Sequence, residues 1–183
     1  MEAENPTFKA RTKGIGILKL DEAISLGATG PILRASGLKA DLRKDDPYEV
    51  YQKFNFEIPV REEGDIYARF LIGLAEVKES TKIVRQALQS LPKGEFILPK
   101  FKKPKINMKI KEGEAYVHNE IARGEGGMHV ISDGGKNPYR IKVRGPSFSH
   151  MIPVLEYLLR GAELADIPAI YWSLNVCPAD LDR

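Results

Sequence analysis

Residues able to bind a redox metal are scarce in this chain. Its 183 residues include one cysteine, Cys177, and three scattered histidines, His118, His129 and His150. An iron–sulfur cluster usually takes four thiolate ligands, and a structural zinc takes about four Cys or His ligands. We therefore expect this chain alone to bind no metal cofactor. It cannot form an intrachain disulfide either, because its single cysteine has no partner.

Charged side chains are the second candidate for chemistry, and they gather in the segment 114–149. Apolar and polar residues alternate there between turns rich in Gly, Asp, Asn and Pro, which is typical of half-buried antiparallel strands. The charged residues of these strands and turns are Arg123, Glu125, Asp133, Arg140, Lys142 and Arg144. Two interpretations stay open: a solvated polar face, or a charge network that is buried or lies in an interface. The alternation places Arg140, Lys142 and Arg144 on one face of the last strand.

The longest element that positions these residues is a helix that Asp65 begins as N-cap and that Pro92 and Gly94 end. Apolar residues recur along it at helical spacing and predict a core-facing stripe. The stripe consists of Ile66, Phe70, Leu74, Val77, Ile83, Val84, Ala87, Leu88 and Leu91. The charged residues interpreted as the solvated face of this helix are Arg69, Glu76, Lys78 and Glu79.

Shorter helices are expected before and after these two segments. Residues 5–37 predict short helices stopped by glycines, with Asn5 as an N-cap and a loop of small residues over 29–37. Near the C-terminus, the spacing predicts an amphipathic helix over 149–167. The apolar run that follows should be buried, with Trp172 filling core.

These elements predict an α+β fold that is mostly helical, with a small antiparallel sheet around residues 114–144. The length suits a single domain, 1–183, that is large enough to bury a core. No run of 18 apolar residues is present, and the first residues lack the apolar core of a signal peptide. We therefore expect a protein without a transmembrane segment, with the cytoplasm as its default location.

The formal net charge of +3 is too weak to argue for nucleic-acid binding. A basic loop over 99–111 carries much of the positive charge. A solvated loop is one interpretation, and docking to an acidic partner or to anionic lipid head groups is another. Nothing in the loop itself decides between them.

Several motifs follow one another in an order that composition alone does not produce. They are TGPILRASG at 29–37, DLRKDDPY at 41–48, RGE at 123–125, SDGG at 132–135 and PYRIKVRGPSFS at 138–149. In this order they resemble the C-terminal half of the D-type large subunit of respiratory complex I. That protein is related to the large subunit of the [NiFe] hydrogenases.

The resemblance also predicts a role for the C-terminal tail, residues 175–183. The hydrogenase relatives carry a Cys-x-x-Cys pair here that holds nickel and iron, with an Asp two residues before it. Cys177 matches the first cysteine, Asp180 stands in place of the second, and Asn175 stands in place of the Asp. In complex I the same loop walls a quinone cavity, so the resemblance implies that Asn175, Val176 and Cys177 line an acceptor cavity. For Cys177 an ordinary role as a small buried residue stays open.

The resemblance also implies partners, a function and a peripheral position on the cytoplasmic side of a membrane. The expected partners are an N-terminal half of the large subunit, a small iron–sulfur subunit and the membrane subunits of a respiratory-type complex. Electrons would pass from the partner's iron–sulfur cluster to a quinone-type acceptor, coupled to ion translocation, and this chain would be inactive alone. The alternatives are a fragment of an energy-converting [NiFe]-hydrogenase-type large subunit, which the missing second cysteine opposes, and a non-catalytic scaffold subunit.

Overall fold

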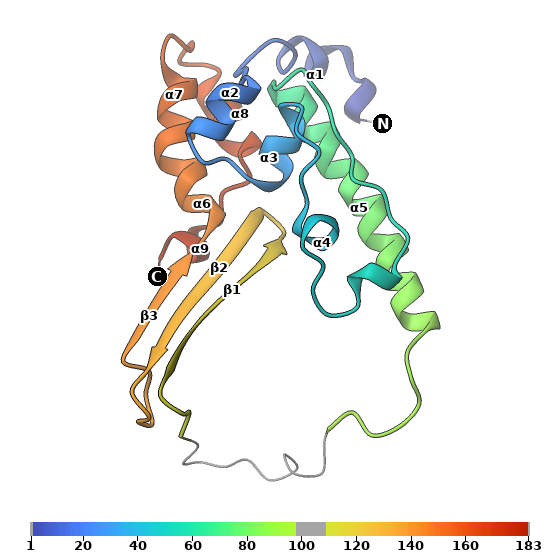
Figure 1. Cartoon of the computed structure of the whole chain (residues 1–183). Coiled ribbons are helices and arrows are strands. Elements are labelled where there is room, and N and C mark those ends of the chain that lie inside the picture. The colour runs from blue at the N-terminus through green and yellow to red at the C-terminus, as the bar shows by residue number, and fades with distance from the viewer. Residues whose placement is uncertain (1, 98–108, 183) are drawn as a thin grey trace.

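The structure is a computed structural model that describes residues 2–97 and 109–182. Short helices from both ends of the chain form a cluster, and two longer elements extend from it on opposite sides (Figure 1). One is the long helix α5 (Ile66–Gln89), and the other is a sheet of the strands β1 (Gly113–Ile121), β2 (Gly124–Ser132) and β3 (Arg140–Arg144). This arrangement confirms the α+β class.

The N-terminal part consists of short helical pieces, of which only those within residues 5–37 fall in the range where short helices are predicted. They are η1 (Glu2–Glu4), α1 (Pro6–Ala10), α2 (Leu20–Ser25), α3 (Gly30–Ala35), α4 (Leu42–Asp45) and η2 (Tyr51–Lys53). Asn5 caps α1 by accepting hydrogen bonds from the backbone N–H groups of Thr7 and Phe8. The prediction of a loop over 29–37 is wrong, because helix α3 lies within this range. Burial of Ile32, Leu33 and Ala35 outweighs the loop-forming tendency of the small residues.

Helix α5 begins where predicted, because the Asp65 carboxylate accepts a hydrogen bond from the N–H of Ala68 at 2.7 Å. The predicted buried and solvated faces of this helix, however, are partly exchanged in the structure. Arg69 is buried rather than solvated. Glu76 is held by Arg34, with the guanidinium nitrogen 2.6 Å from the carboxylate. Much of the apolar stripe that should face a core is exposed instead.

The antiparallel sheet is confirmed, with the strand order β1-β2-β3 in the described part of the chain. Strand β1 pairs with β2 in a register that sets Glu120 opposite Glu125, and Gly127 of β2 pairs with Arg144 of β3. The tight β1–β2 turn carries the RGE motif and ends beside the helical cluster (Figure 1).

The C-terminal part is helical but more broken than predicted. It contains α6 (Pro146–Ser149), the π-helical turn η4 (His150–Val154), α7 (Leu155–Leu159), α8 (Ile167–Ser173) and α9 (Pro178–Leu181). The helix predicted to reach residue 167 ends at Leu159, shortly before Gly161 adopts a positive φ of 77°. Pro153 lies inside η4, and because proline donates no backbone hydrogen bond, the regular helical pattern is interrupted there.

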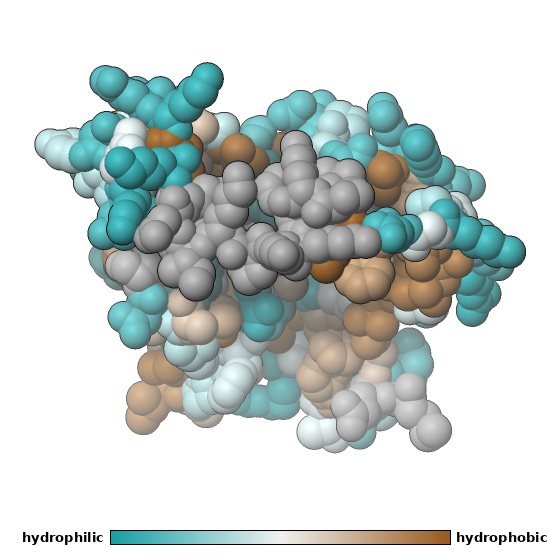
Figure 2. Space-filling model, turned by 90° about the horizontal axis from the view of Figure 1, so that it is seen from below, coloured by the Kyte–Doolittle hydropathy of each residue, from teal (hydrophilic) through white to brown (hydrophobic). Residues whose placement is uncertain are grey.

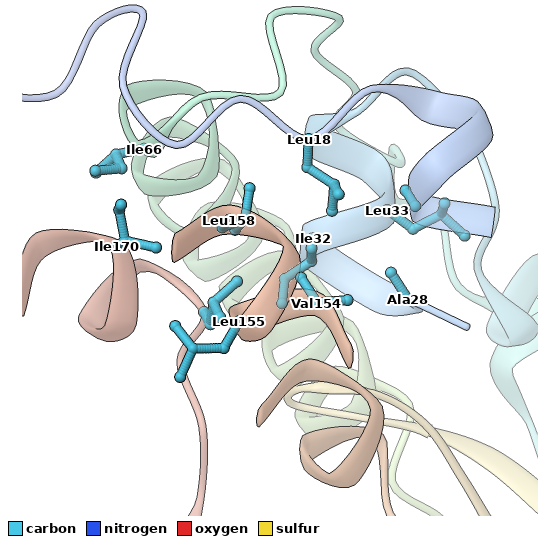
Figure 3. Close-up of a cluster of buried hydrophobic side chains, with 11 residues drawn as sticks. Leu18, Ala28, Ile32, Leu33, Ile66, Val154, Leu155, Leu158 and Ile170 are labelled. Atoms are coloured by element: carbon cyan, nitrogen blue, oxygen red, sulfur yellow. The ribbon is translucent and has the colours of Figure 1, made fainter. Parts of the chain in front are cut away.

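The main hydrophobic core joins α2, α3, the start of α5, η4, α7 and α8 (Figure 3). Ile32 of α3, Val154 of η4 and Ile170 of α8 are all buried in it. Trp172 was predicted to fill core, but it is 77% exposed, so that prediction is wrong. On α8 it is Ile170 that faces the core, and Leu174 just beyond the helix is buried with it. Most of the basic loop, residues 99–108, lies outside the described residues.

Candidate functional site

A cavity of about 690 Å³ lies where α3, α5, the β1–β2 turn and the end of α8 come together. Its polar lining residues are Arg34, Arg43, Arg69, Glu76, Ser80, Thr81, Glu120, Arg123, Ser173 and Asn175. Two residues predicted to be functional, Asn175 and Arg123, therefore line the same cavity. Val176 and Cys177 do not line it, and Val176 instead packs against the hydrophobic core.

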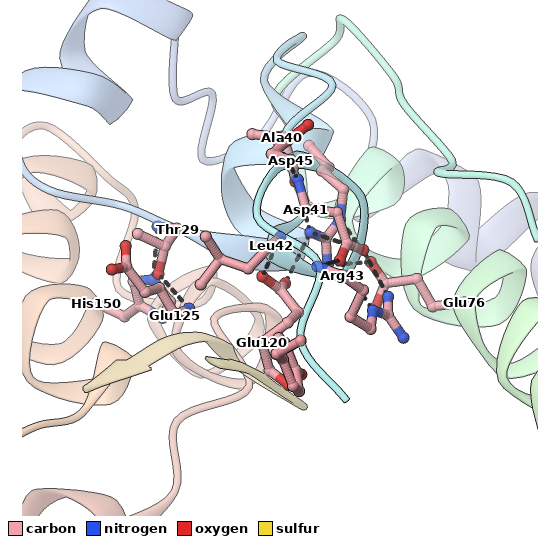
Figure 4. A network of polar contacts seen from close by, with 12 residues as sticks. Thr29, Ala40, Asp41, Leu42, Arg43, Asp45, Glu76, Glu120, Glu125 and His150 are labelled. Atoms are coloured by element: carbon pink, nitrogen blue, oxygen red, sulfur yellow. Dashed lines mark hydrogen bonds and ion pairs between the residues drawn. The ribbon is translucent and has the colours of Figure 1, made fainter. Parts of the chain in front are cut away.

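Buried ion pairs centred on Arg34 form one wall of the cavity. Figure 4 shows the acidic members of this network, Asp41, Glu76 and Glu120. The Arg34 side chain is 1% exposed, and its guanidinium lies 2.6 Å from Glu76 and 2.8 Å from Glu120. It also donates a 2.8 Å hydrogen bond to the carbonyl of Ala40. One residue of the LRASG motif thus ties together α3, α5 and β1.

Asp41 of the second motif extends this network. Its carboxylate is 3.6 Å from Arg34 and accepts hydrogen bonds from both Nε and Nη2 of Arg43, at 2.9 and 2.6 Å. This two-point contact is the strong geometry for an arginine and a carboxylate. Burial by itself would raise the pKa of Asp41, but the Arg43 hydrogen bonds and the charges of Arg43 and Arg34 together outweigh it, so the pKa is lowered.

Glu120 and Arg34 respond to burial in different ways. Burial raises the pKa of Glu120, and the nearby Arg34 only partly opposes this. Burial disfavours the charged form of Arg34, but Glu76 and Glu120 outweigh it, so its pKa is raised. Both Glu120 oxygens accept hydrogen bonds, from Arg34 and from the N–H of Leu42. Glu120 is therefore a positioning group in this wall.

Arg69 is a second buried cation at the cavity, but it lacks an ion pair among the described residues. It donates hydrogen bonds to the carbonyls of Gly64 and Gly16, at 2.7 and 2.9 Å, and to the Ser173 hydroxyl at 2.9 Å. Burial lowers its pKa to about 10, so it stays charged at neutral pH. It holds α5 against α8 and leaves positive charge next to the cavity.

The TGP and RGE motifs meet backbone to backbone at this site. A Cβ on Gly30 would lie 2.3 Å from the Cα of Gly124, and a Cβ on Gly124 would lie 2.4 Å from the Thr29 hydroxyl. Both glycines also have positive φ, at 62° and 135°. The Thr29 hydroxyl accepts a hydrogen bond from the N–H of Glu125 at 3.1 Å. The two motifs therefore need glycine because their backbones touch.

The tail is fixed by the PSF motif and by the RGE turn. Asn175 has a positive φ of 50°, which asparagine tolerates better than most residues, and its carbonyl accepts a 3.2 Å hydrogen bond from Arg123 Nε. The N–H of Cys177 donates to the Ser147 hydroxyl at 3.1 Å, and the Asp180 carboxylate accepts from the N–H of Ser147 at 2.8 Å.

These contacts bear on the nickel–iron alternative. The position of a second cysteine is occupied by Asp180, whose carboxylate is engaged by a backbone N–H. Among the described residues, no group of three or more His, Cys, Asp or Glu side chains could hold a metal ion. A thiolate-bound nickel–iron centre does not fit this donor set.

His150 is fully buried directly after the PSFS segment and faces the TGP motif. Its Nε2 accepts a 3.3 Å hydrogen bond from the N–H of Thr29, whereas Nδ1 has no hydrogen-bond partner among the residues that the structure describes. Burial, followed by the charge of Arg144, lowers the pKa of His150 to about 4. The ring is therefore neutral at neutral pH and links the start of η4 to the start of α3.

The predicted charge network on the sheet is brought together only in part. Arg144 lies 3.5 Å from the Glu125 carboxylate, and Glu125 is also 3.1 Å from His118. Arg140 and Lys142 are exposed, and neither forms an ion pair with a described residue. Asp133 is exposed too, and its carboxylate accepts from the N–H of Gly135 within the SDGG turn. An interface role for these three residues stays a prediction.

The residues that sequence reasoning missed are Arg34, Arg69, Glu76, Glu120 and His150. For two of them the sequence held a usable signal. Arg69 and Glu76 are spaced three residues before and four residues after Ile72, so all three share one helical face. Ile72 is buried. The pairing of Arg34 with Glu120 had no such signal, because 86 residues separate the two.

None of the described helices has the length and apolar content needed to cross a membrane. A family model for the 49 kDa subunit of the respiratory-chain NADH dehydrogenase matches residues 1–106 and 96–183.

Individual relatives agree with the family model. The D subunit of the NADH-quinone oxidoreductase from Dehalococcoides mccartyi is 42% identical, and its counterpart from the Wolbachia pipientis of Culex pipiens is 37% identical, each over 98% of this chain. A solved chain of the membrane-bound sulfane sulfur reductase, an archaeal respiratory membrane complex, is 45% identical with a TM-score of 0.90. This chain spans about half of each relative: 47%, 51% and 49% of their lengths.

Proposed function

Because the chain belongs to the family of the 49 kDa subunit of respiratory-chain NADH dehydrogenase, we propose that it is the C-terminal part of the large subunit in a membrane-bound, complex I-like oxidoreductase. In this proposal an iron–sulfur cluster of a partner protein delivers electrons to a quinone-type acceptor, and the reaction is coupled to ion translocation. The redox chemistry belongs to the cofactor and the acceptor, and this chain supplies positioning and electrostatics.

The observation that carries the proposal is the convergence of the motifs on one cavity. The LRASG residue Arg34, the RGE residue Arg123 and the tail residue Asn175 come from distant parts of the sequence and line the same space. The stability of the fold is enough to explain buried ion pairs. It does not require a cavity of about 690 Å³ beside them. That volume lies within the range of roughly 300–1,000 Å³ that small-molecule sites occupy.

A rigid charged wall suits acceptor reduction. Arg69, which has no carboxylate ion pair among the described residues, places positive charge at the cavity. Glu76 and Glu120 hold the Arg34 guanidinium in place and balance its charge. Fixed cations stabilise negative charge that develops on an acceptor as electrons arrive, and they do so without reorganising. Among the residues of this wall, Asn175 is a neutral amide at the tail end of the cavity.

The solved structure favours a second candidate acceptor, sulfane sulfur. The sulfane sulfur reductase chain is 45% identical to this chain, and the match covers 98% of this chain. The two acceptors are distinguished by assaying membranes that contain the assembled complex with a quinone analogue and, separately, with polysulfide. Reduction of one and not the other identifies the acceptor class.

Co-purification from membranes tests the proposal directly. An affinity tag on this chain should recover an iron–sulfur subunit, the other half of the large subunit and hydrophobic membrane subunits. Recovery of none of them, or stoichiometric nickel bound through Cys177, contradicts the proposal. Nucleic-acid binding that falls steeply with salt and persists without partners would favour a scaffold or binding role instead.

A further inference from the structure

His118 of β1 lies between two carboxylates that come from different parts of the chain. Its Nε2 is 2.9 Å from the carboxylate of Asp46, just beyond α4, and its Nδ1 is 3.1 Å from the carboxylate of Glu125 on β2. A neutral imidazole carries one N–H, so its other nitrogen would turn a lone pair toward a carboxylate oxygen. The doubly protonated ring can donate to both partners. The observed geometry is therefore that of an imidazolium.

The register of the sheet explains how Glu125 reaches His118. Gly127 is paired with His118 on one side and with Arg144 on the other, and it contributes no side chain between them. Glu125 lies two residues before Gly127, on the same face of β2. Its second carboxylate oxygen is 3.5 Å from Arg144. The RGE carboxylate is thus flanked by His118 and by Arg144.

The groups around His118 favour its protonated form. The hydrogen bond with Asp46, followed by that with Glu125, raises the pKa of His118 and outweighs the opposing effect of burial. The groups that face it or share a surface hollow with it are the carboxylates of Asp46, Glu49, Glu125 and Asp180, the phenols of Tyr48 and Tyr116, and the Arg144 guanidinium. Among these described groups, carboxylates outnumber cations.

The segment 41–48, to which Asp46 belongs, carries part of the cavity wall. Asp41 lies 3.6 Å from Arg34, and it holds the Arg43 guanidinium with two hydrogen bonds. Arg43 itself lines the cavity. The position of this wall therefore depends on how the segment 41–48 is held.

The sheet holds this segment through polar contacts with β1. The N–H of Leu42 donates to the Glu120 carboxylate at 3.4 Å, and the Tyr48 hydroxyl donates to the Glu120 carbonyl at 3.3 Å. The contact between His118 and Asp46 is shorter than either, at 2.9 Å, and it joins two charged groups. It is therefore the strongest of these contacts while His118 is protonated.

We propose that His118 is a proton-dependent positioning residue: its protonated ring holds the segment 41–48 on the sheet, and loss of the proton loosens the segment together with Arg43. The Asp46 side chain is 72% exposed, so the pair adds little to global stability, and its effect is a local opening. Because the pKa of His118 is raised above 6.5 in the folded chain, the contact is complete below pH 6.5 and is lost as the pH rises through the folded value. The inference goes beyond the proposed function and does not require it.

Hydrogen–deuterium exchange measures the opening directly. The N–H groups of Lys44, Asp45 and Asp46 donate hydrogen bonds at α4, and a helix of four residues is not stable once it detaches. Exchange is followed by mass spectrometry in the tagged chain as purified with its partners, with labelling times scaled to cancel base catalysis of exchange. We expect the protection of this peptide to be roughly fivefold higher at pH 6 than at pH 9.

Two substitutions of His118 separate its charge from its presence. His118→Gln should give the low protection of pH 9 at both pH values, because a neutral amide forms no ion pair. His118→Arg keeps a permanent cation with several donors and should give the high protection at both. His129→Gln is the matched control, because His129 lies in the same sheet and pairs with Glu114 instead. It should keep the wild-type pH dependence.

A substitution of the carboxylate partner checks the same contact from the other side. Asp46→Asn should lower the protection at pH 6 and remove its pH dependence. Glu49→Gln removes a carboxylate three residues away that forms no ion pair with a described residue, and it should behave as wild type. The far-ultraviolet circular dichroism of all these variants should match wild type, because each replaced side chain is at least partly exposed.

Acceptor kinetics in the assembled complex provide a second readout, which depends on the proposed function. The KM for the acceptor should rise with pH in wild type more than in His118→Arg, because Arg43 is then held less firmly at the cavity. Equal protection of wild type and His118→Gln at pH 6, or loss of protection at pH 9 in His118→Arg, overturns the proposal. A complex that reduces no acceptor at any pH contradicts the proposed function instead, and the exchange measurement still decides the role of His118.

Discussion

At the scale of single residues, Arg34 places one cation among three acidic side chains. Its guanidinium contacts Glu76 and Glu120 closely and Asp41 more distantly, almost without exposure to water. A buried ion pair is no guarantee of net stability, because removing charges from water is costly. Loss of one member is nevertheless severe, because the remaining charges stay buried without compensation.

Arg34→Ala should therefore destabilise the protein by about 3–5 kcal/mol. In the co-purified assembly this predicts a melting temperature lower by roughly 10 °C. The matched control is Lys39→Ala, which removes an exposed cation without an ion pair in the described chain and should change the stability by less than about 0.5 kcal/mol. Equal melting temperatures for the two variants would show that the Arg34 pairs do not hold the wall together.

Because His150 is buried, we expect the stability of the protein to fall in acid. Burial lowers its pKa to about 4 from an ordinary 6.5, and Arg144 adds to this, while the charge of Asp180 opposes it. Folding thus favours the neutral ring, and its stabilising contribution is complete above pH 6.5 and is lost as the pH falls towards 4. The loss amounts to about 3 kcal/mol.

His150→Gln keeps a hydrogen-bond acceptor for Thr29 but cannot titrate in this range. Its melting temperature should fall less than that of wild type between pH 7 and pH 4, as measured by thermal melting across that range. His129→Gln is the control, because His129 is partly exposed and paired with Glu114. Identical acid profiles for wild type and His150→Gln would assign the acid response to other groups.

Asn175 predicts an effect on activity rather than on folding. It lines the cavity and cannot titrate, so acceptor reduction should lack a pH dependence that originates at this position. Asn175→Asp introduces a carboxylate whose pKa responds to its surroundings, and it should change the pH profile or the acceptor affinity. Acceptor-reduction kinetics in the assembled complex, with electron transfer within the iron–sulfur partner as control, provide the measurement. Unchanged kinetics would place the tail away from the chemistry.

At the scale of elements, the β1–β2 turn and the start of α3 are joined by close backbone contact. Gly30 and Gly124 allow this approach, and Thr29 secures it with a hydrogen bond. The contact brings Glu120 and Arg123, at the two sides of the turn, to the cavity. The geometry of the site therefore depends on two glycines that take no part in its chemistry.

Gly124→Ala should destabilise the assembly by about 2–4 kcal/mol, because the added Cβ would overlap Thr29 and a positive φ disfavours alanine. Gly113→Ala is the matched control, since a Cβ there meets no described atom within 4 Å, and its effect should stay within about 0.5 kcal/mol. Thermal melting of the two variants measures the difference. A melting temperature for Gly124→Ala close to that of the control would mean that the two motifs separate without cost.

At the scale of the whole molecule, α5 exposes the apolar side chains of Leu74, Val77, Val84 and Leu88. Seen from below, apolar surface is exposed on the side where α5 ends (Figure 2). This exposed surface and the half-length match to the relatives give the same expectation. Exposed apolar surface of this extent favours association in a chain without its partner. The isolated chain should therefore self-associate, as seen by size-exclusion chromatography with light scattering. Co-expression with the other half of the large subunit should raise its soluble yield and sharpen its melting. A monodisperse monomer with a sharp, reversible transition would contradict this expectation.

The sequence by itself determined the local structure and the family. Alternation predicted the sheet, Asn5 and Asp65 predicted two helix starts, and the ordered motifs indicated the family that the comparisons confirm. These signals lie within a few residues of one another or in their order along the chain. Cap geometry and strand alternation depend on neighbouring residues, so a single sequence is enough to read them.

Only the tertiary structure decided what each face and each charge does. Leu74 and Ile83 are both apolar and both fit a helical stripe, yet one is exposed and the other is buried. Arg34 and Arg140 are the same residue type, yet one is enclosed by carboxylates and the other is solvated. The environment of each side chain is set by segments as distant as the 86 residues between Arg34 and Glu120. Burial and pairing are properties of those long-range contacts, and local sequence patterns do not encode them.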